Sequence, residues 1–246
     1  GKYGVADSAE QQEIYGMLLE KQPSMLQELY RAVREGSGDA EAIFSAVMDY
    51  YNKHKMDITI EDAEGLELGG RPLQQIQKET FVDCWNYLFA MGLTKDQVIA
   101  VIANMHAEGE LSPTNRQNTK DNKAIEDPDY IFLTDDNVGY GICQWTFKGR
   151  KEGLQNIANE MGKKVSDLDV QLEYFRYEME ESYDFRFIWP EFLDIQERND
   201  MIEFYYTDIE KPASSKDKNS EKYKEAMLKR IGYADDIESW YISIFG

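Results

Sequence analysis

Two amphipathic segments that follow one another between residues 75 and 109 place the strongest constraint on the fold of this chain. The first carries apolar side chains at helical spacing and is closed by Gly92: Phe81, Cys84, Trp85, Leu88 and Phe89. Thr94-Lys95-Asp96-Gln97 matches a capping box, so we expect the next helix to begin at Lys95. Its apolar stripe is Val98, Val101, Ile102 and Met105, and Gly109 is expected to end it. The pattern predicts a helical core.

Residues 1–74 are predicted to form a small helical module. Helical spacing recurs around Ile14, and a third helix follows Asp39. Between them, a second helix is expected to open at Pro23 and stop at Gly36, with an apolar stripe of Leu26, Leu29, Tyr30 and Val33. The stretch Asp57–Pro72 is interpreted as a linker with short extended pieces, which places the domain boundary near residue 74. The module carries no recognisable chemistry. It could dock a partner or pack onto the second domain, predicted at 75–246.

The rest of the chain is predicted to be helical with one β wing. The polar residues 109–129 are expected to form a long loop, and two short strands are expected at 130–134 and 138–145 around an Asp135-Asp136-Asn137 turn. Helices are expected at the positions 150–161, 167–181, roughly 194–208, and from the end of a polar stretch at 214–220 to about 231. The expected fold class is mostly α (α+β), with a small β wing.

Charge and composition exclude several classes of function. The chain of 246 residues has 27 basic and 47 acidic side chains, a net charge of −20, which argues against nucleic-acid binding. No apolar run reaches the ~20 residues that span a bilayer, so no membrane contact is expected. Two histidines, two cysteines and no metal-ligand spacing predict no metal or organic cofactor, although Cys84 and Cys143 could pair. Because the chain begins with Gly1-Lys2 rather than Met, we expect it to be a piece of a longer protein.

Glu108 is the first candidate for chemistry. It occupies the next position on the apolar stripe after Met105, at the carboxyl end of the predicted helix. Burial and the negative end of the helix dipole both disfavour a carboxylate, and therefore favour the neutral acid that a glycosidase uses as general acid. The same pattern also fits an ordinary Glu that ends a helix and turns into solvent.

The second candidate is the segment from Gly139 to Thr146. Two glycines flank Tyr140, and Gln144 and Trp145 follow, which together offer close backbone approach, a hydrogen-bonding side chain and an aromatic face. A groove that binds sugars needs these features, although a β-turn with buried aromatic residues has the same sequence pattern.

Taken together, these two segments resemble the phage tail-tip lysozyme family of the lysozyme-like superfamily. The resemblance rests on Asn104–Pro113 and Gly139–Thr146, and continues through Gly149-Arg150-Lys151, Gln171–Glu178 and Phe204–Pro212. It covers residues 78–235 and leaves the N-terminal module out. Two departures stand out: the family usually has Glu-Ser-Gly where this chain has Glu108-Gly109-Glu110, and often has paired arginines at Arg150-Lys151.

The resemblance implies cleavage of the β-1,4 bond between N-acetylmuramic acid and N-acetylglucosamine in peptidoglycan glycan strands, with Glu108 as general acid/base. It places Tyr140, Gln144 and Trp145 in the segment that lines the glycan groove, and it implies action outside the cell, at the cell wall or a virion tail. Asp136 is the candidate for a second catalytic carboxylate, or a simple turn residue. Two alternatives remain at this level: a lytic transglycosylase that gives 1,6-anhydro products, and a glycan-binding module without activity.

Overall fold

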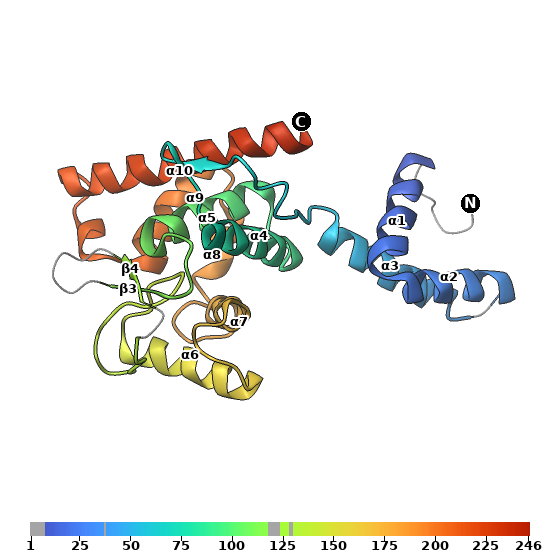
Figure 1. Cartoon of the computed structure of the whole chain (residues 1–246), viewed down its shortest axis with the longest axis horizontal. Helices are drawn as coiled ribbons and strands as arrows, with labels where there is room; N and C mark the ends of the chain where they lie inside the picture. Colours follow the sequence, from blue (N-terminus) through green and yellow to red (C-terminus); the bar gives the residue numbers. More distant parts are fainter. Residues whose placement is uncertain (1–7, 37, 118–123, 128–129) are drawn as a thin grey trace. The chain divides into compact units, whose positions relative to one another are not determined.

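The computed structural model describes residues 8–36, 38–117, 124–127 and 130–246. The chain divides into two compact units (Figure 1). The smaller unit consists of Gly1–Asp57 and Phe89–Gly92, and the larger one of Ile58–Leu88 and Leu93–Gly246. The stretch predicted as a linker packs mainly within the larger unit, where Ile58, Leu66 and Leu68 are buried.

Three helices build the smaller unit: α1 (Ser8–Lys21), α2 (Pro23–Glu35) and α3 (Ala40–His54). They correspond to the predicted helices, and Gly36 adopts the left-handed conformation that ends α2. Their core is formed by Leu18, Val47 and neighbouring apolar side chains. Tyr30 and Val33, which the periodicity assigned to the buried stripe of α2, are instead more than half exposed.

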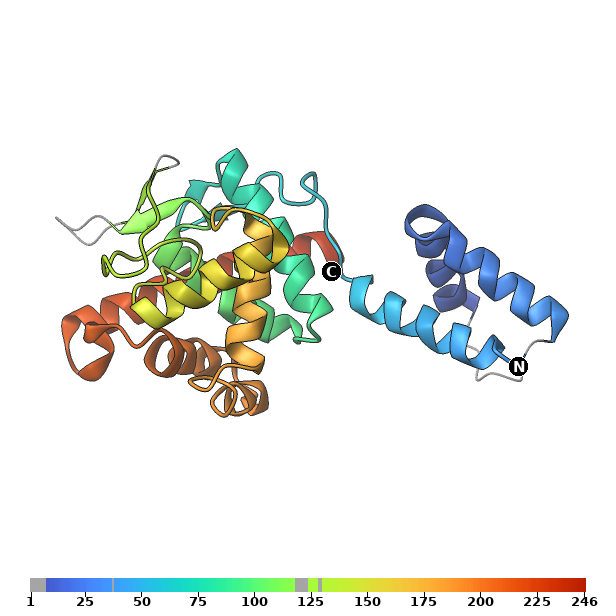
Figure 2. The same ribbon diagram turned by 90° about the horizontal axis from the view of Figure 1, so that it is seen from below.

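Helix α5 (Lys95–Gly109) is the centre of the larger unit, and α4 (Gln75–Ala90) precedes it. Both halves of the predicted capping box at Thr94 and Gln97 are present. α9 (Arg198–Phe204) and α10 (Glu221–Phe245) pack against α5, and Figures 1 and 2 show α10 running across the unit. As a result, α5 is buried along almost its whole length. None of the helices among the described residues is long and apolar enough to cross a membrane.

The carboxyl-terminal half contains more helix than the sequence predicted. α6 (Lys148–Met161) and α7 (Leu168–Glu180) lie where they were expected, whereas the short α8 (Trp189–Asp194) was not predicted. α9 continues into a π-helical turn, η1 (Tyr205–Glu210), and a short 3₁₀ turn, η2 (Ala213–Lys216), follows. α10 does not end near residue 231 but runs on to Phe245, because Ala234, Ile237 and Trp240 continue its buried face.

The small β structure is present, but not at the predicted positions. β3 (Asn115–Gln117) pairs antiparallel with β4 (Ala124–Glu126), inside the segment predicted as a loop. A second pair joins β1 (Glu67–Leu68) to β2 (Arg71–Pro72). Parts of the predicted loop, at 118–123 and 128–129, lie outside the described residues.

The strands predicted at 130–134 and 138–145 are wrong. Tyr140 makes only isolated bridges, to Arg116 and Trp145, and the residues between Tyr140 and Trp145 form a tight turn. Gly141 and Gln144 both have positive φ angles, 78° and 47°, which a regular strand does not accommodate. Residues 139–142 are buried one after another, so this segment lacks the alternate burial of a strand.

Candidate active site

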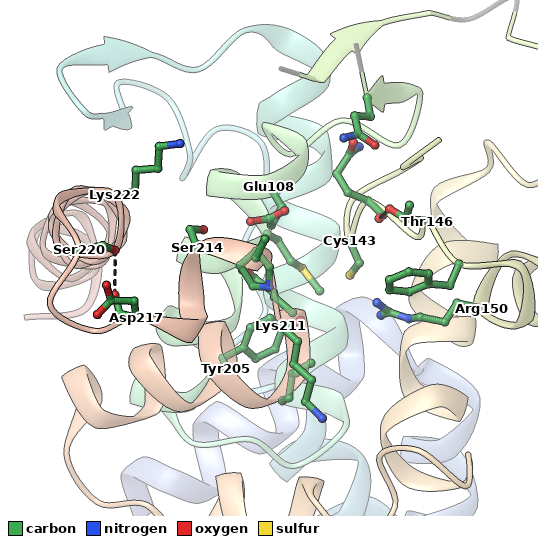
Figure 3. Close-up of a pocket in the computed structure, with 18 residues that line it drawn as sticks. Glu108, Cys143, Thr146, Arg150, Tyr205, Lys211, Ser214, Asp217, Ser220 and Lys222 are labelled. Carbon is green, nitrogen blue, oxygen red and sulfur yellow. Dashed lines mark hydrogen bonds between the residues drawn. The ribbon is translucent and has the colours of Figure 1, made fainter. Parts of the chain in front are cut away.

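A cavity of about 840 Å³ lies in the larger unit, at the carboxyl end of α5. Its wall is built from six segments: the last turn of α5, the end of β3 at Gln117, the turn around Gln144, the start of α6, the stretch from η1 through η2, and the start of α10. Figure 3 shows Glu108 in the middle of this cavity, between Ser214 on one side and Thr146 on the other. The side chain of Glu108 is 29% exposed, so its carboxylate is both anchored by protein and accessible from the cavity.

The end of α5 is shaped by close backbone contacts. A Cβ atom on Gly109 would lie 2.6 Å from the carbonyl oxygen of Gly141, so the turn can approach the helix only because residue 109 is glycine. Gln171 fastens this turn from α7, where it accepts a hydrogen bond from the Ile142 amide at 3.0 Å and donates one to the Pro113 carbonyl at 2.7 Å. These contacts fix the position of Glu108 relative to the turn that carries Gln144.

The two residues that depart from the Glu-Ser-Gly pattern, Gly109 and Glu110, both have unusual surroundings or backbone geometry. Glu110, at the position where the family has glycine, adopts a left-handed conformation with φ 52°. We expect Glu110→Gly to stabilise the fold by up to about 1 kcal/mol, because it relieves this conformation.

We expect Gly109→Ala to destabilise the fold by about 1–3 kcal/mol through the contact with Gly141. Urea unfolding with Glu110→Ala as the control measures both, and a Gly109→Ala variant as stable as the wild type would contradict this packing.

Arg230 of α10 is the main partner of Glu108. Its Nη2 atom lies 2.5 Å from Glu108 Oε1 and 2.7 Å from Glu210 Oε2. Its Nε donates to Asn104 Oδ1 at 2.8 Å, and its guanidinium lies over the ring of Tyr206, 4.3 Å from the centroid. The two neighbouring carboxylates outweigh burial and raise the pKa of Arg230, so the group is a fixed cation beside Glu108. Sequence reasoning did not predict this counter-charge.

Glu210 is the second carboxyl group at the floor of the cavity. It is the last residue of the π-helical turn η1, and its side chain is only 9% exposed. Burial raises the pKa of Glu210 well above its usual value, and the neighbouring Glu108 raises it further, against the opposing effect of Arg230. A π-helical turn is rare and is often found at functional sites.

Of the three predicted groove residues, Gln144 alone lines the cavity in the part of the chain that the structure describes. Its amide donates to the carbonyls of Asn115 at 3.1 Å and Gly141 at 2.9 Å. Trp145 is fully buried, and Tyr140 is 3% exposed. The indole of Trp145 donates a hydrogen bond to Glu178 at 3.0 Å, and its ring packs on Tyr174, so Trp145 anchors the turn to α7.

Asp136 does not line the cavity as described. Burial on its own would raise its pKa, but hydrogen bonds from Lys151, Tyr130 and the Val138 amide lower it, so the group is a carboxylate. Lys151 is fully buried and donates to Asp136 at 2.6 Å. Asp136 thus holds its loop against α6. The catalytic role suggested for Asp136 stays a prediction.

Other residues singled out in the sequence take supporting positions. Glu178 is the buried partner of Arg150, which donates to it through Nε at 2.5 Å and Nη2 at 2.7 Å. Cys84 and Cys143 are free thiols. His106 is buried against Tyr233, and desolvation lowers its pKa to about 4. Within the described ranges, no group of three or more His, Cys, Asp or Glu side chains could hold a metal ion.

Phe147 is a cavity residue that the sequence reasoning missed. It follows the Gln144-Trp145-Thr146 segment directly, and it is 70% exposed in the wall of the cavity. The available signal was a second aromatic residue two positions after Trp145, which had been predicted to line the groove. Further lining side chains come from residues that lie far along the chain: Tyr205, Lys211, Ser214, Asp217, Ser220 and Lys222.

A mostly helical domain with a small β wing and an acid-bearing cavity at a helix end has the architecture of a lysozyme-like enzyme. The family model of the phage tail lysozymes matches residues 79–241, well over half of the chain, and the chain therefore belongs to the phage tail lysozyme family. Comparison with curated proteins and with solved structures gives no significant match. Family membership makes peptidoglycan the substrate of a lysozyme-like activity.

Proposed function

We propose that this protein is a muramidase, a glycosidase that cleaves the β-1,4 bond between N-acetylmuramic acid and N-acetylglucosamine with Glu108 as the general acid/base. The observation that carries this proposal is the position of Glu108, whose carboxyl group lies in the wall of the cavity within the family-matched domain. General-acid catalysis requires a carboxyl that reaches the glycosidic oxygen while being held by protein groups. The proposed site of action is the cell wall, reached from a virion tail or another extracellular position.

The cavity wall supports a glycan as substrate. Gln144, Ser214 and Ser220 place amide and hydroxyl groups around Glu108, and Phe147 adds an exposed aromatic face. Sugars present hydroxyl groups at their edges and apolar C–H groups on their faces, so they need both kinds of contact. This set of contacts supports Gln144 as a substrate-binding residue and gives the stacking role to Phe147, since Tyr140 and Trp145 are buried.

Lytic transglycosylation is the second candidate for the same site. In that reaction, the 6-hydroxyl of muramic acid replaces water as the nucleophile, so one carboxyl group is sufficient. Three carboxyl groups line the cavity, namely Glu108, the deeply buried Glu210 and the exposed Asp217, while Asp136 lies elsewhere. Ser214 lies between Asp217 and Glu108, and this separation of the two exposed carboxylates is the observation that favours the alternative.

Solubilisation of purified cell walls tests the proposal. The wild-type chain should lower the turbidity of a wall suspension and release new glycan ends. Binding to the walls without release of glycan would instead identify a module that retains the groove and lacks activity. Docking of a partner through residues 1–74 stays a separate prediction, and wall binding by the chain with and without this segment tests it.

Phe147→Ala should weaken glycan binding about three- to tenfold, which corresponds to an aromatic contact of about 0.5–1.5 kcal/mol. The melting temperature should stay unchanged because the ring is exposed. Phe187→Ala is the matched control, since Phe187 is similarly exposed, at 67%, and does not line the cavity. Equal binding by the two variants in a wall pull-down would remove Phe147 from the substrate-binding surface.

A further inference from the structure

The floor of the cavity holds two carboxyl groups around a single guanidinium. Arg230 Nη2 contacts Glu108 Oε1 at 2.5 Å and Glu210 Oε2 at 2.7 Å, and the side chains of Arg230 and Glu210 are 5% and 9% exposed. This cluster of three side chains therefore contains two acids and one cation, and it is largely shielded from water. Full ionisation would leave one negative charge uncompensated, which is costly at low dielectric.

Among the described residues, Arg230 is the only cation that forms an ion pair with Glu108 or Glu210, although Lys211 and Lys222 also line the cavity. Arg150 of α6 is engaged by Glu178 of α7 in a two-point contact. Cys143, in the turn, and Tyr205, on η1 itself, face Glu210 as neutral groups whose pKa values burial raises well above their usual range. Lys229, next to Arg230 on α10, has a pKa lowered by burial and by repulsion from Arg230. Binding of one proton by the two carboxyl groups is therefore the easiest way to neutralise the remaining negative charge.

Glu210 is the carboxyl group that favours this proton. Burial is the largest cause that raises the pKa of Glu210, and Glu108 adds to it. Its second oxygen, Oε1, is buried and has no hydrogen-bond partner among the described residues. A buried carboxylate oxygen without a donor is unfavourable, whereas a protonated carboxyl group carries less charge on that oxygen.

We propose that Glu108 and Glu210 form a carboxyl pair that shares one proton around Arg230, with Glu210 as the positioning residue that keeps this proton available to Glu108. The proposal rests on the proposed function, because it explains how Glu108 can act as an acid beside a fixed cation. Arg230 alone would hold Glu108 as a carboxylate. With Glu210 present, the proton that burial favours on Glu210 can pass to the neighbouring Glu108, and Arg230 then balances the ionised Glu210.

The proton balance of the reaction follows. Glu108 gives the shared proton to the glycosidic oxygen as the bond from that oxygen to the anomeric carbon breaks. Both carboxyl groups are then ionised around Arg230, a state that readily takes a proton back. Attack of water, or of the muramic acid 6-hydroxyl, on the anomeric carbon forms the new C–O bond and releases one proton. That proton returns to the pair.

The pH profile of wall solubilisation by Glu210→Gln tests the proposal. Loss of the second acid should leave Glu108 paired with Arg230 alone, so the alkaline limb should move down by about one pH unit or more. Activity at pH 7 should fall about tenfold or more and recover at lower pH. In the double variant Glu210→Gln/Arg230→Gln the limb should move back up, because the cation that holds Glu108 ionised is gone.

Glu203→Gln is the matched control, because Glu203 pairs with Lys218 and Tyr223 outside the cavity and its loss should leave the pH profile unchanged. An unshifted profile for a folded Glu210→Gln variant would overturn the proposal. Infrared spectroscopy of the wild-type chain is independent of whether the variants fold: one protonated carboxyl group at pH 7 supports the pair, and none overturns it. Glu108→Gln is assayed in parallel, since activity in that variant would instead refute the proposed function.

Discussion

Replacing Glu108 with Gln should lower the rate of wall solubilisation by at least ~10²-fold, because it removes the proton donor of the reaction. The amide is nearly isosteric and can still accept a hydrogen bond from Arg230, so the fold should be retained. The rate is best measured as turbidity loss of purified walls, with circular dichroism to confirm folding. Glu110→Gln is the control, because Glu110 is exposed and lies outside the lining of the cavity.

Two outcomes would contradict this assignment. Retention by a folded Glu108→Gln variant of more than about a tenth of the wild-type rate would move the catalytic role to another residue. An equal loss of rate in Glu110→Gln would show that any change at the end of α5 disturbs the site. In either case the cavity would have to be reinterpreted without Glu108 as the acid.

The largest effect on stability is expected at Glu178. Its carboxylate is 2% exposed and accepts hydrogen bonds from Arg150 and from the Trp145 indole. Glu178→Gln removes the buried charge and leaves Arg150, whose side chain is 18% exposed, without its anion, which should cost about 3–5 kcal/mol of the free energy of unfolding. Trp145 and the turn that carries Gln144 should loosen with it. Urea unfolding measures the loss.

Glu180→Gln on the same helix is the matched comparison. Glu180 pairs with Arg176 at 3.0 Å, but its side chain is 38% exposed, so its removal should cost no more than about 1 kcal/mol. Equal stability losses for the two variants would mean that the contact between Glu178 and Arg150 is exposed in solution rather than buried.

Local patterns predicted much of the helical structure. The capping box at Thr94, the stripe of α5 and the stop at Gly36 each depend on neighbours a few residues apart, and the structure confirms all three. Glu108 could be singled out for the same reason, since its distance from Met105 on the helix is fixed by the period of the helix. Even so, periodicity does not say whether a stripe is covered, and Tyr30 and Val33 are exposed.

Contacts between distant segments could not be predicted in this way. Arg230 reaches Glu108 across 122 positions of the chain, and no spacing rule connects the two residues. The small β wing is present, but its strand positions were wrong for a related reason. Alternating apolar residues at 138–145 are compatible with a strand, whereas the positive φ angles and the contacts of Gly141 with Gln171 show that the segment turns. Trp145 looked like a stacking residue because burial by α7 is not visible in the local sequence.

The product chemistry of a peptidoglycan digest tests the central claim most directly. Purified peptidoglycan is digested with the wild-type chain and with Glu108→Gln, and the soluble fragments are reduced and analysed by mass spectrometry. The account predicts fragments that end in reducible N-acetylmuramic acid with the wild type and none with the variant. Fragments lighter by one water that resist reduction would place the enzyme among the lytic transglycosylases. Reducible N-acetylglucosamine ends, cleaved peptide bonds or no fragments at all would contradict the assignment of a muramidase.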